Sequence, residues 1–157
     1  MSVEGLKRLK VWGRAKDFSI KIYKQALPLL PAEEKWNLNQ QLRRSSLSIS
    51  TNIAEGYGRF YYQENVRFCY IARGSLEETL SHLIFALEMN YIPAELYKEL
   101  EIEGEEIDKM LNGYISFLKK SKQGANEPGA NLAVHEEPAP YTVEPSEDTS
   151  TTEDTTL

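Results

Sequence analysis

Two adjacent arginines, Arg43 and Arg44, are the first residues whose chemistry the local sequence leaves unexplained. An ion pair on a helix surface needs an acid three or four positions away. No acid stands at those positions around either arginine. Their counter-charge must therefore come from a partner helix, such as one bearing Glu77 and Glu78, from another subunit, or from a polyanion. We favour a tertiary or intersubunit ion pair, with phosphate contact and simple solvent exposure as the open alternatives.

Arg59 and Arg67 differ, because Glu55 lies four residues before the first and Glu64 three residues before the second. Such local pairs stabilise a helix by only ~0.2–0.5 kcal/mol. Both arginines lie in a stretch that interleaves basic and aromatic side chains, the latter being Tyr57, Phe60, Tyr61 and Tyr62. Aromatic faces stack on unpaired bases while arginine contacts phosphate or guanine edges. The same composition is typical of a protein interface, and we favour packing over base stacking.

Further basic residues precede these arginines and predict a patch on the first half of the chain. Around a ring of subunits, weak phosphate contacts would reinforce one another through their effective concentration. The candidate nucleic-acid-binding residues are Arg43, Arg44, Arg59, Arg67, Lys7, Arg8, Lys10 and Arg14.

Arg73 falls on the apolar stripe of a predicted helix, with Glu77 four residues after it. A buried arginine must be paired and hydrogen-bonded, and Glu77 is a poor sole partner if it faces solvent. We predict that Arg73 bridges helices or subunits. The candidate structural and oligomer-contact residues are Arg73, Glu77, Tyr57, Phe60, Tyr61, Tyr62, Phe68 and Ile71.

Motifs for catalysis are nearly absent. The phosphate-binding P-loop, the paired-histidine zinc helix and the nucleophile elbow are all missing. A di-iron bundle needs Glu-x-x-His on two helices, whereas Thr79 stands three residues before His82 and the other histidine is His135. Cys69, the single cysteine, falls on an apolar stripe and reads as a core residue rather than a nucleophile. We therefore predict no enzyme, no metal and no cofactor.

The net charge of −6 conceals an uneven distribution along the 157 residues. Residues 1–74 carry +7, residues 75–122 carry −5, and residues 123–157 carry −8. Closed head-to-tail assemblies need unlike surfaces that complement each other. Our first hypothesis is a non-catalytic, homo-oligomeric bundle that binds nucleic acid through its basic half. The charge split also fits a second hypothesis, a protein scaffold whose basic and acidic halves meet between subunits or partners without any nucleic acid.

Residues 123–157 hold four of the seven prolines, eight Ser or Thr residues and one aromatic, Tyr141. Such a segment buries too little apolar surface to offset the entropy of ordering. We predict a disordered acidic tail behind a domain of residues 1–122. The tail either solvates the domain or acts as an acidic mimic that folds back on the basic half.

Hydrophobic periodicity predicts four helices and no sheet. Apolar residues recur every three or four positions in residues 11–29, from Pro31 to Gly56, in residues 66–87, and from Pro93 to Lys122. Short joints make neighbouring helices antiparallel, so we predict an all-α, up-down-up-down four-helix bundle. Extra apolar residues beside the third stripe favour an oligomer. No segment reads as a membrane span or a secretory signal, which predicts a cytoplasmic protein.

Three ordered blocks, residues 42–49, 52–59 and 70–78, carry a family resemblance: LRRSSLSI, NIAEGYGR and YIARGSLEE. They closely resemble four-helix-bundle proteins encoded by intervening sequences in bacterial 23S rRNA genes, over roughly residues 8–120. More distantly, the chain is similar to the accessory variability determinant proteins of diversity-generating retroelements. The resemblance implies a ring-like homopentamer and a nucleic-acid role, with RNA or a nucleic-acid-processing protein as partner. The acidic tail departs from the family pattern.

Overall fold

The computed structural model describes residues 2–126, so the predicted disorder of the tail lies almost entirely outside the described residues. Its α-helices are α1 (Val3–Arg8), α2 (Lys10–Lys21), α3 (Leu38–Tyr57), α4 (Tyr62–Glu88) and α5 (Ala94–Ser121). No strand occurs within this range, which confirms the predicted all-α class. None of these helices is long and apolar enough to cross a membrane.

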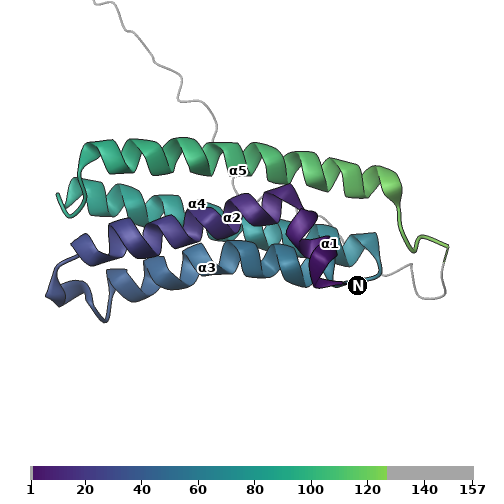
Figure 1. The fold of residues 1–157 in the computed structure, drawn as a ribbon, viewed down its shortest axis with the longest axis horizontal. Coiled ribbons are helices and arrows are strands. Elements are labelled where there is room, and N and C mark those ends of the chain that lie inside the picture. Colours follow the sequence, from purple (N-terminus) through teal and green to yellow (C-terminus); the bar gives the residue numbers. More distant parts are fainter. Residues whose placement is uncertain (1, 127–157) are drawn as a thin grey trace, which may run out of the picture.

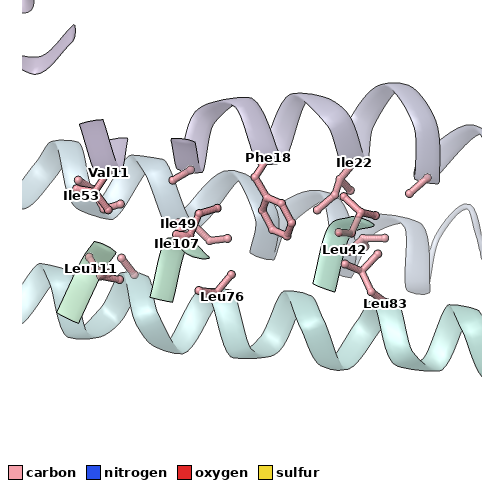
Figure 2. Close-up of a cluster of buried hydrophobic side chains, with 14 of the residues drawn as sticks. Val11, Phe18, Ile22, Leu42, Ile49, Ile53, Leu76, Leu83, Ile107 and Leu111 are labelled. Carbon is pink, nitrogen blue, oxygen red and sulfur yellow. The ribbon is translucent and has the colours of Figure 1, made fainter. Parts of the chain in front are cut away.

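The four longer helices lie side by side, and each runs opposite to the one before it in the chain (Figure 1). Helix α3 packs against α2 and α4, and α5 closes the arrangement by packing against α4 and α2. The core between them is built from the apolar stripes that the sequence predicts (Figure 2). Its fully buried large side chains include Phe18, Ile22, Leu42, Ile49, Ile53, Leu76, Leu83, Leu100, Ile107 and Leu111.

The first predicted helix is shorter than its apolar pattern. After Lys21 the chain continues as a π-helical turn, η1 (Ile22–Ala26), and a 3-10 turn, η2 (Leu27–Leu29). Pro28 lacks the N–H that would continue the helical ladder, and the change of pitch rotates later residues off the stripe. Leu29, predicted to face the core, is therefore 47% exposed.

The predicted start of the second helix at Pro31 is also wrong. A 3-10 turn, η3 (Ala32–Glu34), follows the proline, and α3 begins only at Leu38. The Glu34 carboxylate accepts a hydrogen bond of 3.1 Å from the Leu38 backbone N–H. This acid therefore caps α3 from outside the helix, where negative charge favours a helix start.

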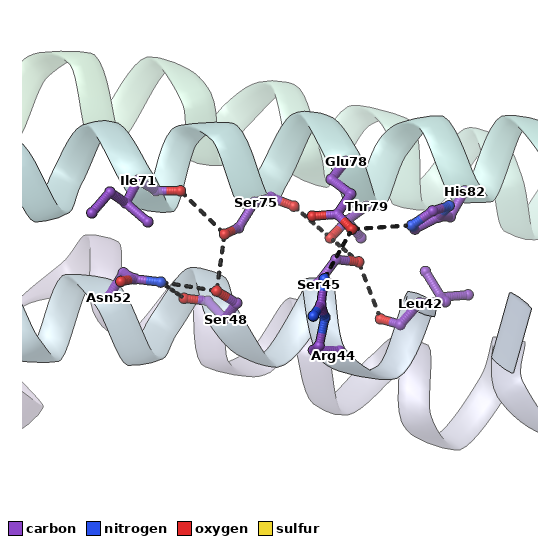
Figure 3. A network of polar contacts seen from close by, with 10 residues as sticks. All are labelled: Leu42, Arg44, Ser45, Ser48, Asn52, Ile71, Ser75, Glu78, Thr79 and His82. Atoms are coloured by element: carbon purple, nitrogen blue, oxygen red, sulfur yellow. Dashed lines mark hydrogen bonds and ion pairs between the residues drawn. The ribbon is translucent and has the colours of Figure 1, made fainter. Parts of the chain in front are cut away.

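Small hydroxyl side chains line the contact between α3 and α4 (Figure 3). Ser48 Oγ lies 2.9 Å from Ser75 Oγ. Thr79 Oγ1 lies 3.0 Å from Ser45 Oγ and 2.7 Å from the Ser75 carbonyl oxygen. The small hydroxyls of Ser45 and Ser48 therefore allow the close approach of α3 and α4 within one chain.

Candidate nucleic-acid interface

Four segments meet at one end of the molecule: α1, the C-terminus of α3, the N-terminus of α4 and the C-terminus of α5 (Figure 1). Tyr62 donates its backbone N–H to the Gln123 carbonyl at 3.1 Å, and Asn65 Nδ2 donates to Tyr114 Oη at 3.1 Å. We call residues 2–10, 55–67 and 113–126 the basic end. Their eight basic and three acidic side chains give a net charge of +5.

The opposite end carries the opposite charge. Residues 24–36 and 85–103, which we call the acidic end, contain three basic and seven acidic side chains, a net charge of −4. These segments contain η2, η3 and the α4–α5 connection. The folded chain therefore has a charge difference along its long axis, which the division of the sequence into halves expressed only in part.

Some cations of the basic end are neutralised within the chain. Lys7 pairs with Glu4 at 3.1 Å, and Arg59 pairs with Glu55 and, at 4.0 Å, with Glu64. Other exposed cations there make no ion pair with any described residue, namely Arg8, Lys10, Arg67, Lys120 and Lys122. These five are the groups best placed to meet an external anion.

The aromatic residues of this end are divided between packing and exposure. Tyr57, Tyr61 and Tyr62 are half-buried. Phe60 is 53% exposed and meets the edge of Tyr61, with ring centroids 5.3 Å apart. Phe68 is also half-buried, and the Arg59 guanidinium lies 5.2 Å from its ring centroid. Phe60 is therefore the most open of the predicted aromatic set, whereas the others mainly pack inside the chain.

Arg73 links α4 to α5 through residues that the sequence did not single out. Its Nη1 donates to Asn112 Oδ1 at 3.0 Å. Its guanidinium also lies 4.9 Å from the Tyr70 ring centroid, and Lys119 Nζ lies 5.4 Å from the same centroid. Glu77 is exposed and makes no ion pair within residues 2–126. Ile71, also in the predicted contact set, is exposed on α4.

The remaining predicted basic residues lie away from the basic end. Arg44 Nη2 is 3.9 Å from Glu78 Oε1 on α4 (Figure 3), and at 76% side-chain exposure this is a weak pair. The Arg43 guanidinium lies 4.5 Å from the Tyr23 ring centroid. The part of α3 from Arg44 to its end at Tyr57 is about 20 Å long, and Arg59 lies beyond it.

Arg14 on α2 pairs with Glu106 on α5 and is likewise engaged within the chain. Arg14, Arg43 and Arg44 therefore contact groups of their own chain, and none of them belongs to the set of unpaired cations at the basic end.

Potential catalytic groups are few. Burial raises the pKa of the Cys69 thiol to about 12, so this thiol is protonated at neutral pH. Its Sγ lies 3.6 Å from Asn65 Oδ1. His82 Nε2 lies 3.4 Å from Glu78 Oε1. In residues 2–126 no three His, Cys, Asp or Glu side chains cluster as metal ligands would.

These features define an all-α protein of four long antiparallel helices with one basic, partly aromatic end. Residues 7–113 match the family of 23S rRNA-intervening sequence proteins, and the chain belongs to that family. It is also similar to a solved structure of a protein of unknown function from the S23 ribosomal protein family of Bacteroides thetaiotaomicron. The two share 26% identity with a TM-score of 0.62, over 67% of this chain and 97% of that one. No curated protein matches the sequence.

Proposed function

We propose that this protein is a non-catalytic four-helix bundle that assembles as a homo-oligomer and binds structured RNA or single-stranded nucleic acid through its basic end. The observation that carries the proposal is the gathering of unpaired cations from four separate helices at one end of the molecule. Such a surface suits a phosphate backbone, because binding releases the counterions that surround it. The family name refers to intervening sequences of 23S rRNA, which makes RNA the first nucleic acid to test.

The arrangement favours recognition of shape and charge over sequence. Long, exposed lysine and arginine side chains contact phosphates without reading bases. Phe60 offers one exposed aromatic face beside these cations, and such a face stacks on any unpaired base. We therefore expect similar affinity for single strands of different sequence, and weaker binding to a fully paired duplex.

Homo-oligomerisation is supported by apolar side chains that one chain leaves exposed. They lie on α3 and α4: Leu47, Ile71, Ile84 and Phe85. Apolar side chains that gather on one exposed face mark surfaces that another protein covers, and we assign this role to the α3–α4 face. The pentameric count comes from the family resemblance alone, and native mass spectrometry of the full chain tests it.

The first test is a salt titration of RNA binding by the full chain, in which binding is measured by the fluorescence anisotropy of a labelled single strand. Each phosphate contact to a single strand contributes about −0.7 to the slope of log affinity against log salt. Replacing Arg67 and Lys120 with Ala should therefore make the slope about 1.4 shallower. The matched control replaces Lys24 and Lys35 with Ala. Both lysines lie at the acidic end, and this variant removes the same amount of charge. Equal effects of the two variants would overturn the assignment.

The second candidate function is a protein scaffold without nucleic acid. It is favoured by the net charges of +5 and −4 at the two ends, which complement each other between copies. Reversing the charge of Arg67 and Lys120 to Glu separates the two functions. Loss of RNA binding by an intact oligomer favours the nucleic-acid function, whereas dissociation of the oligomer favours the scaffold.

A further inference from the structure

The last described residues lead the chain across the basic end. Lys122, at φ 48°, ends α5 in a left-handed conformation and turns the backbone away from the helix axis. The Gln123 carbonyl then accepts the Tyr62 backbone N–H at 3.1 Å. The last described residues therefore lie beside the connection between α3 and α4, next to Phe60 and Tyr61.

This route is built into the sequence at Gly124. Its φ of 81° is a conformation that side-chain-bearing residues rarely adopt. A Cβ at this position would lie 2.7 Å from Tyr61 Cδ1 and 3.2 Å from Phe60 Cε1. Only glycine lets the backbone approach the two aromatic rings so closely, and this contact fixes the path of residues 122–126 across the basic end.

The segment that starts there complements this surface in charge. Residues 127–157 contain eight acidic and no basic side chains, against a net charge of +5 on the basic end. Thirty-one residues span at most about 100 Å, so every cation of the basic end lies within their reach. A tethered partner that starts beside its site also acts at a high effective concentration.

We propose that residues 127–157 bind the basic end of their own chain and compete there with nucleic acid. The acidic side chains replace phosphates as counter-charges for the cations that make no ion pair within residues 2–126. The competition rests on the proposed function, whereas the docking itself does not. A tail that occupies the surface nine-tenths of the time weakens the apparent affinity for RNA about tenfold.

The docking is tested in the full chain by carbodiimide cross-linking of carboxylates to lysines, with peptide mapping. Lys7 and Lys10 are the informative targets, because both are distant from the tail in sequence. Lys10 makes no ion pair within residues 2–126, and the pair of Lys7 with Glu4 is exposed and therefore weak. Lys24, Lys35 and Lys98 at the acidic end are the controls. We expect tail cross-links to Lys7 and Lys10 at least tenfold more often than to the controls at low salt, with the preference lost in about 1 M salt, where charges are screened within about 3 Å.

The salt series separates charge attraction from mere covalent proximity of the tail, because cross-links that arise only from proximity do not depend on salt. A mixture of nitrogen-15-labelled and unlabelled protein separates links within a chain from links between copies. Absent links to Lys7 and Lys10, a preference that survives high salt, or links only between copies would each overturn the docking. The last result would identify a second copy as the occupant.

The competition is tested with a full-chain variant in which the eight tail acids become Gln or Asn. We expect its apparent Kd for the RNA strand to fall about tenfold at low salt. A control variant with the tail sequence permuted but its acids retained should match the wild type. An unchanged Kd overturns the competition. Absence of RNA binding in every variant, together with the expected cross-links, would refute the proposed function while leaving the docking supported.

Discussion

Gly56 offers a direct test of how closely α3 and α4 approach. It lies in the last turn of α3 and is buried. A Cβ at this position would lie 2.8 Å from Phe68 Cβ and 3.0 Å from the Asn65 carbonyl oxygen. Both atoms are held by the α4 backbone and cannot rotate away as the tip of a side chain would. The Gly56→Ala substitution therefore requires the two helices to separate locally.

Two opposing effects set the size of the change. Replacing glycine with alanine inside a helix stabilises it by roughly 0.5–1 kcal/mol, and by less near a helix end. Overpacking a close contact destabilises a protein by about 1–3 kcal/mol. For Gly56→Ala we expect a net loss of about 1–2 kcal/mol in the free energy of unfolding, because the steric effect is larger.

The matched control is Gly113→Ala, in the interior of α5. A Cβ there meets nothing within 4 Å, so we expect a gain of about 0.5–1 kcal/mol. Gly104→Ala is an intermediate case, because its nearest contact is the flexible end of Leu80 at 2.8 Å. We expect this third variant to be close to neutral.

The assay is urea unfolding of the full chain, monitored by circular dichroism. All variants are compared at one protein concentration, because oligomerisation makes apparent stability concentration-dependent. An unchanged denaturant slope ensures that stability rather than compactness has changed. Equal stability of the Gly56→Ala and Gly113→Ala variants would refute the close approach of α3 and α4 at this point.

Three further predictions concern single side chains. Glu103 and Glu99 raise the pKa of Lys21, so Lys21→Met should lower stability by about 1 kcal/mol at pH 7. This difference in stability is complete below the unfolded pKa of Lys21, about 10.4, and should vanish as the pH rises through the higher folded pKa. Urea unfolding from pH 8 to 11.5 checks it, and a difference in stability that stays constant over this range would contradict it. Cys69 should react with a disulfide reagent at pH 8 about a thousandfold more slowly in the native protein than in urea, and rapid native labelling would disprove its burial. Arg73→Lys should lower the melting temperature by about 2–4 °C by weakening the link from α4 to α5, whereas an unchanged melting temperature would show that this link adds no stability.

The apolar stripes of the last two long helices were predictable because no proline interrupts either helix. Leu76, Leu83 and Leu111 are all fully buried, as their spacing predicts. The pattern failed where backbone chemistry overrides periodicity. Leu29 keeps the helical spacing but follows Pro28, and the loss of a backbone donor there changes the helix type before the stripe is complete.

The candidate site was less predictable, because sequence analysis grouped cations by their position along the chain. Lys119, Lys120 and Lys122 belong to the half of residues 1–122 with net negative charge, and lysines at the end of a helix are explained by the helix dipole alone. The predicted antiparallel topology was nevertheless sufficient to predict that these lysines lie at the same end of the molecule as the basic N-terminus. In such an arrangement the start of the first helix and the end of the fourth lie at the same end of the bundle, which these lysines therefore share with Arg8 and Lys10.

The same topology determines where the positive charge of the basic end comes from. Because the long helices alternate in direction, their dipoles oppose one another, and the N-terminus of α4 lies beside the C-termini of α3 and α5. The positive charge of this end therefore comes from side chains rather than from helix termini. Each neutral replacement of an exposed cation should remove about one phosphate contact, so single replacements at Arg67, Lys120 and Lys122 should reduce the salt slope by similar amounts. One dominant residue among the three would instead indicate a localised pocket, and would contradict binding by a distributed surface.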